Sequence, residues 1–86
     1  MAGAHEEALA WLDRSMAEDP TWTSTHRVRA ATLAWLGRQA EAEAAAARFM
    51  ELEPSYRIHR AMRLYRPSPG KERFVEGMRR AGVPYE

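Results

Sequence analysis

The sequence predicts an all-α protein of about five helices, and three observations support this fold class. Apolar residues recur at three- and four-residue steps, and proline or glycine interrupts the chain at intervals of about one helix length. No segment alternates apolar and polar residues in the way that a half-buried strand does. Eighty-six residues, of which 45% are hydrophobic, allow one small core, so we expect residues 1–86 to form a single helical domain.

Residues that cap or stop helices set the expected boundaries. Asp19-Pro20 and Glu53-Pro54 end helices, because a residue before proline avoids helical geometry. Gly37 and Gly82 suit the left-handed conformation in which many helices end, and Ser68 can cap a helix that has proline in its first turn. The expected helices cover about residues 4–18, 23–36, 38–52, 55–65 and 69–81.

Two segments of the chain resemble each other at one fixed offset, which is the separation of Pro20 from Pro54. Residues 6–20 read EEALAWLDRSMAEDP and residues 40–54 read AEAEAAAARFMELEP, with six identities in fifteen positions. Alanine and glutamate inflate such a count, so the arginine, methionine and proline matches carry the weight. Internal similarity at this period indicates a repeated structural unit.

A unit of helix, tight turn, helix and proline at this period resembles the tetratricopeptide repeat, which measures about 34 residues. Ala8 and Ala42 stand at the family's small alanine position, and Gly37 falls in the turn within a repeat. The chain departs from the pattern at His26, where the family has tryptophan, and at Arg29, where it has leucine. A further departure is an exchange of large and small residues, since Ala46 stands at the usual aromatic position and Phe49 at the usual alanine.

The resemblance implies antiparallel helical hairpins in a defined register. Residues 4–20 would be half a repeat, 21–54 a full repeat and 55–86 an abbreviated C-terminal hairpin. A repeat helix without its neighbour exposes an apolar face, so we expect either a piece of a longer protein or a chain that pairs with itself, for example as a homodimer. The expected self-association residues are Leu9, Trp11 and Leu12.

The C-terminal segment has a resemblance of its own. ELEPSY, followed by YRPSPGKERFVEGMRRAGVPYE, is similar to the end of tetratricopeptide regions in bacterial signalling proteins, namely class III adenylate or guanylate cyclases and winged-helix regulators. This implies the end of a repeat array, and it offers an alternative function as a regulatory or dimerising tail. Frequent alanine and arginine, a single lysine and no asparagine are typical of a GC-rich bacterial genome.

The family register also implies a concave groove that would bind a peptide or a partner helix. A mixed surface of apolar side chains and arginine suits such a ligand, although Val28, Trp35 and Met62 can equally be core residues. The expected lining is Ser24, Arg27, Val28, Ala31, Ala34 and Trp35 from one helix and Ile58, Ala61, Met62 and Tyr65 from a following one.

Charge is distributed unevenly along the chain. Residues 1–54 carry five Arg against nine Asp and Glu, whereas residues 55–86 carry eight Arg and Lys against three Glu. Arg57, Arg60 and Arg63 would form one stripe on the fourth expected helix. This basic half could bind nucleic acid, face solvent or pair with the acidic half, and we regard nucleic acid as the weakest of these alternatives.

Nothing in the sequence indicates catalysis. There is no cysteine, and the three histidines lack the spacing of metal ligands. No phosphate-binding loop is present, and no apolar run is long enough to span a membrane. We therefore expect a cytoplasmic protein–protein interaction module that is not an enzyme and needs no metal or cofactor.

Overall fold

The computed structural model describes residues 3–86, and over that range it contains helices and no strands. The all-α prediction is confirmed, and the bounds of four helices agree with those expected to within one or two residues. The fourth helix is the exception, because it covers five residues in place of about eleven. The helices are α1 (Ala4–Glu18), α2 (Thr23–Trp35), α3 (Gln39–Leu52), α4 (Ile58–Met62) and α5 (Pro69–Ala81).

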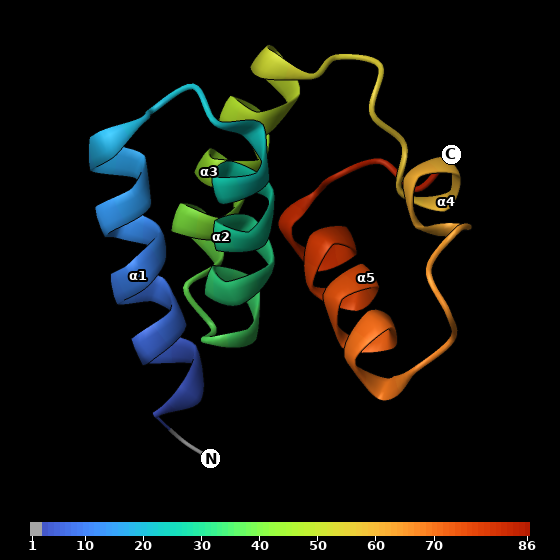
Figure 1. Cartoon of the computed structure of the whole chain (residues 1–86), viewed down its shortest axis with the longest axis horizontal. Helices are drawn as coiled ribbons and strands as arrows, with labels where there is room; N and C mark the ends of the chain where they lie inside the picture. The colour runs from blue at the N-terminus through green and yellow to red at the C-terminus, as the bar shows by residue number, and fades with distance from the viewer. Residues whose placement is uncertain (1–2) are drawn as a thin grey trace.

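Helix α2 is the centre of the molecule, and three other helices pack against it (Figure 1). Helix α1 covers one side of α2, α5 covers the other, and α3 returns beside α2 after the tight turn at Gly37. Helix α3 also contacts α5, so the core lies between α2, α3 and α5. Its largest fully buried side chains are Phe49, Leu33, Ile58 and Met78.

The helix ends follow local sequence rules. Gly37 and Gly82 both have positive φ, at 78° and 102°, and each lets the next amide donate to a carbonyl oxygen five residues back. The Ser68 side chain accepts a hydrogen bond from the Lys71 amide at 3.1 Å, as expected of an N-cap. Helix α2 differs, since Trp22 precedes it and no side chain caps it.

The ends of α1 and α3 are alike in their hydrogen bonds. The Asp19 amide donates to the Ser15 carbonyl at 2.9 Å, and the Glu53 amide donates to the Phe49 carbonyl at 2.8 Å. The two pairs stand at the same offset as Pro20 and Pro54, and both cap residues leave helical geometry. The duplicated sequence therefore forms duplicated local structure.

The segments that follow α1 and α3 share one more backbone hydrogen bond, and beyond it their structures differ. The Trp22 amide donates to the Asp19 carbonyl at 3.3 Å, and the Tyr56 amide donates to the Glu53 carbonyl at 3.1 Å, again at the repeat offset. The next residue after Tyr56, Arg57, is extended where its counterpart Thr23 begins α2.

The C-terminal residues explain why α4 begins at Ile58 and not at Ser55. The Ile58 amide donates to the Pro84 carbonyl and the His59 amide donates to the Tyr85 carbonyl, both at 3.0 Å. Amides that would otherwise lie inside a helix spanning 55–65 are thus bonded to the end of the chain. Val83 is buried beside them, which fixes the C-terminal segment against the core.

Helix α5 takes the place beside α2 that the repeat register gave to the fourth helix. Within residues 3–86, α4 packs against α5 and makes no close backbone approach to α2 or α3. Helix α5 approaches α2 closely at Gly77, where a Cβ atom would lie 2.9 Å from the Ala31 Cβ and 2.9 Å from the Trp35 Nε1. The absence of a side chain at Gly77 therefore permits this contact.

Candidate functional site

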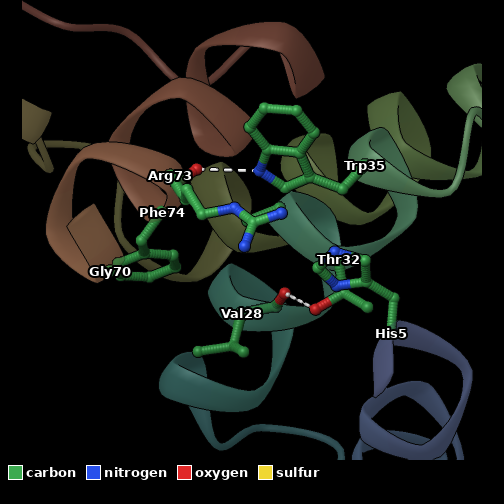
Figure 2. Close-up of a pocket in the computed structure, with 8 residues that line it drawn as sticks. His5, Val28, Thr32, Trp35, Gly70, Arg73 and Phe74 are labelled. Atoms are coloured by element: carbon green, nitrogen blue, oxygen red, sulfur yellow. Dashed lines mark hydrogen bonds between the residues drawn. The ribbon is translucent and has the colours of Figure 1, made fainter. Parts of the chain in front are cut away.

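A cleft of about 240 Å³ opens between α1, α2 and α5 (Figure 2). Its floor comes from α2, where Val28, Ala31 and Trp35 share one face because they are three and four residues apart. Helix α5 supplies the opposite wall, and one residue of α1 lies at the rim. The lining residues are His5, Val28, Ala31, Thr32, Trp35, Gly70, Arg73 and Phe74.

The indole of Trp35 is held in place by α5. Its Nε1–H donates to the Arg73 carbonyl at 2.8 Å, a bond that joins α2 to α5 across the cleft (Figure 2). Two guanidinium groups flank the ring, Arg73 at 5.7 Å and Arg80 at 4.2 Å from its centroid. Such cation–π contacts and the hydrogen bond fix the aromatic wall before any ligand arrives.

Polar groups inside the cleft are few. The Thr32 hydroxyl donates to the Val28 carbonyl at 2.9 Å, so its proton is used within α2. The Arg73 guanidinium lies between Trp35 and Val28, and in residues 3–86 it forms no ion pair with a carboxylate. The cleft therefore combines an apolar floor with one available positive charge.

Arg27 carries a second positive charge, which lies against the Phe74 ring and outside the cleft lining. Its guanidinium lies 5.5 Å from the Phe74 ring and 5.6 Å from the Tyr56 ring, and Nη1 is 3.5 Å from the Tyr56 hydroxyl. Its buried Nε has no hydrogen-bond partner within the described residues, and no carboxylate pairs with the group there. An unpaired cation of this kind raises the local affinity for an anion.

The structure brings some of the residues expected in the groove together and separates others. Val28, Ala31 and Trp35 line the cleft, while Ser24 and Arg27 are half-buried on the same helix outside its lining. The residues expected from the fourth helix were assigned wrongly: Ile58 and Met62 are buried in the core, and Tyr65 is exposed away from the cleft. The reason is that α4 packs against α5 and not against α2.

The true second wall, formed by Gly70, Arg73 and Phe74, was not predicted. A signal for α5 as a packing helix exists, because Phe74, Gly77, Met78 and Ala81 recur at three- and four-residue steps. That spacing shows which face of α5 is buried, but it does not show which other helix this face packs against.

The expected self-association residues are separated by the fold. Leu9 is 6% exposed and packs toward α2, so its assignment to an outer surface was wrong. Leu12 is half-buried, whereas Trp11 is 69% exposed with Arg14 over its ring at 5.0 Å. Only Trp11 of the three is open to a partner.

The expected basic stripe is not a single helix face. Arg57 precedes α4 and donates to the carbonyls of Pro54 and Tyr56, at 3.2 and 2.6 Å. Arg60 donates to the Ser55 carbonyl at 2.8 Å, so these two side chains close the turn after α3. Arg63 alone remains without such a bond in the described range.

Residues 3–86 contain neither a metal-binding cluster nor a membrane-spanning helix. No group of three or more His, Asp or Glu side chains there is placed to hold a metal ion. No helix there has the length and apolar character needed to cross a membrane.

No family model matches the chain, and no curated protein or solved structure matches it either. We therefore infer function from the geometry of the cleft itself.

Proposed function

We propose that this chain is a non-enzymatic interaction module that binds a segment of a partner protein in the cleft between α2 and α5. The observation that carries the proposal is the preformed apolar cleft with Trp35 locked in its wall and Arg73 over its opening. Aromatic and arginine side chains together are typical of the energetic centres of protein interfaces.

The volume of the cleft favours a protein ligand over a small molecule. Pockets that enclose a small ligand measure about 300–1,000 Å³. A cleft of about 240 Å³ is smaller and accommodates one or two side chains of a longer ligand. We propose an apolar side chain on the floor formed by Val28 and Ala31, followed by a carboxylate that reaches Arg73.

The repeat architecture belongs to the same proposal. The matching hydrogen bonds at the ends of α1 and α3 support a duplicated helix pair of tetratricopeptide type. In such arrays the helices surround an extended binding surface, which agrees with a cleft along α2. In this chain α4 packs against α5 and not against α2, so α5 forms the second side of the binding surface.

The test is to select ligands from a displayed library of random twelve-residue peptides on the immobilised protein. We expect enriched peptides to share an apolar residue close to an Asp or Glu. Binding of a selected peptide, measured by isothermal titration calorimetry, should weaken at least tenfold in Val28→Glu and in Arg73→Glu.

The matched control is Arg79→Glu, which makes the same charge change as Arg73→Glu on the same helix but outside the cleft. This variant should bind the selected peptide as the unmodified chain does, and circular dichroism should show all three variants folded. Equal affinity of the folded Arg73→Glu and Val28→Glu variants would exclude the cleft as the binding surface.

A further inference from the structure

The two halves of the chain keep their opposite charges in the folded molecule. The ion pairs found in residues 3–86 each join groups from the same half of the sequence. Pairing of the basic half with the acidic half was one of the alternatives left open by the sequence, and no such ion pair occurs among the described residues. These ion pairs are Arg29–Asp13, Arg38–Glu41, Arg48–Glu51 and Arg80–Glu76.

One exposed surface is the outer face of α1. Glu7, Trp11, Arg14 and Glu18 lie along it, since they are three and four residues apart and all are exposed. Trp11 is 69% exposed, and neither glutamate is in an ion pair within the described residues. Exposed Glu6 and Asp19 nearby give this face a net negative charge, and the Arg14 guanidinium lies 5.0 Å from the centroid of the Trp11 ring.

A second exposed surface, which we call the basic corner, lies between α4 and α5. It consists of Arg63, Leu64, Tyr65 and Arg66, with half-buried Lys71 beside them. Leu64 is 86% exposed and Tyr65 55%, while the Lys71 ammonium donates to the Tyr65 carbonyl at 3.0 Å. No acidic residue occurs between Glu53 and Glu72, so every charged side chain of the segment that carries these apolar residues is basic.

Helix α1 and the segment between α4 and α5, which carry these surfaces, lie at opposite ends of the longest axis of the molecule (Figure 1). One chain cannot bring its own surfaces together, but two copies can. Each surface carries exposed apolar side chains, and the net charges of the two surfaces have opposite sign. Contact between them would cover both apolar groups and neutralise charge without any change in the fold.

We propose that copies of this chain associate head to tail, with the outer face of α1 of one copy on the basic corner of the next. Such a contact is heterologous, so it leaves one free surface at each end and allows chains longer than two. A polyanion such as nucleic acid or an anionic bilayer would account for the basic corner only, and the acidic face of α1 would repel it. A second copy accounts for both surfaces.

Association through two small surfaces should be weak and sensitive to salt. Stable interfaces bury about 800 Å² on each partner, a large share of a molecule whose whole accessible surface is 5615 Å². We therefore expect the weight-average molar mass, measured by sedimentation equilibrium, to rise as the protein concentration increases from about 0.05 to 1 mM. The rise should disappear in about 0.5 M salt, because salt screens the attraction between exposed charges.

Two charge-reversed variants test the polarity of the contact. The first, Glu7→Arg with Glu18→Arg, alters only the face of α1, and the second, Arg63→Glu with Arg66→Glu, alters only the basic corner. Each variant alone should be monomeric. An equimolar mixture should associate again, because the intact corner of the first variant meets the intact face of the second. The two reversed surfaces also carry opposite charges, so the two variants should alternate along the assembly.

The control variant is Glu43→Arg with Glu53→Arg, which makes the same charge change on exposed residues away from both surfaces. It should associate as the unmodified chain does. A strictly monomeric unmodified chain at the highest concentration in low salt would overturn the proposal. So would an unmixed variant that still associates, a mixture that stays monomeric, or binding of the basic corner to an oligonucleotide or anionic vesicles without self-association.

Discussion

The segments at the ends of α1 and α3 have the same local structure and different neighbours. Residues 15–22 and 49–56 share two backbone hydrogen bonds in the same order and at equivalent positions of the repeat. After the first segment the chain enters α2, which packs against α1. After the second it enters α4, which packs against α5. Nearby residues therefore set the hydrogen bonds of each segment, whereas distant residues decide which helix the following element packs against.

Side-chain volume is the first difference between the two segments. Ser15 and Phe49 occupy equivalent positions and both provide the capping carbonyl. Ser15 bonds to Thr25 through its hydroxyl at 3.1 Å, whereas Phe49 is 1% exposed and packs edge-on against Tyr56 with ring centroids 4.7 Å apart. The second segment thus contributes far more to the core.

The largest expected effect comes from Phe49→Ala. This substitution empties a buried aromatic site and should lower the free energy of unfolding by about 3–5 kcal/mol. Ser15→Ala at the equivalent position should cost about 1 kcal/mol, the value of one partly exposed hydrogen bond. Urea unfolding of both variants measures the difference, and similar losses would mean that the segments are equivalent in packing as well as in backbone.

The next largest effect is expected from a chain that ends at Gly82. It lacks buried Val83 and the two carbonyls that accept from the Ile58 and His59 amides. Burial of a valine and two hydrogen bonds together suggest a loss of about 2–4 kcal/mol. Amide exchange should rise first in α4, while α1 keeps its protection. Unchanged protection of Ile58 and His59 would contradict the role given to the C-terminal residues.

A smaller effect should follow from filling the contact between α5 and α2. In Gly77→Ala the better helix propensity of alanine, about 1 kcal/mol, opposes the overlap of the new methyl with Ala31 and Trp35. We expect a net destabilisation of about 1–2 kcal/mol by thermal or urea unfolding.

Gly70→Ala is the matched control for Gly77→Ala. A Cβ at Gly70 would meet only the Ser68 Oγ at 3.9 Å, an ordinary contact. This variant should be neutral or slightly stabilising. If Gly77→Ala were equally neutral, the close approach of α5 to α2 would not limit the position of α5.

The smallest effect concerns the starts of the duplicated helices. Arg38 binds the Glu41 carboxylate through two hydrogen bonds of 2.9 and 2.6 Å, whereas its counterpart is Ala4. The Arg38 hydrogen bond lowers the pKa of Glu41, so the stabilisation is present above the ordinary pKa of glutamate and is lost as pH falls through the lowered value. In Arg38→Ala, NMR titration should show the Glu41 pKa higher than in the unmodified chain.

Much of the fold was predictable because its causes are local. Prolines and glycines fix the ends of α1 to α3, and Ser68 with Gly82 fixes α5. The same is true of the cleft floor, since Val28, Ala31 and Trp35 are placed on one face by helix geometry alone. These features depend on residues within one or two turns of each other.

The remainder depends on contacts between residues far apart in sequence. The start of α4 is decided by hydrogen bonds from Ile58 and His59 to residues at the end of the chain. The cleft wall is decided by Gly77, which lets α5 approach α2 more closely than any helix with a side chain there could. The repeat period assigned the place beside α2 to the fourth helix. A sequence period gives the order of helices along the chain, and it does not say which of two later helices packs against α2.

The central claim is that a partner segment binds in the cleft beside Trp35. The chain has three tryptophans, and Trp11 and Trp22 are exposed away from this cleft. A ¹H–¹⁵N correlation spectrum during titration with a selected peptide resolves one indole signal for each. We predict that the Trp35 signal moves and that those of Trp11 and Trp22 do not. A titration in which Trp11 or Trp22 moves while Trp35 stays fixed would contradict the claim.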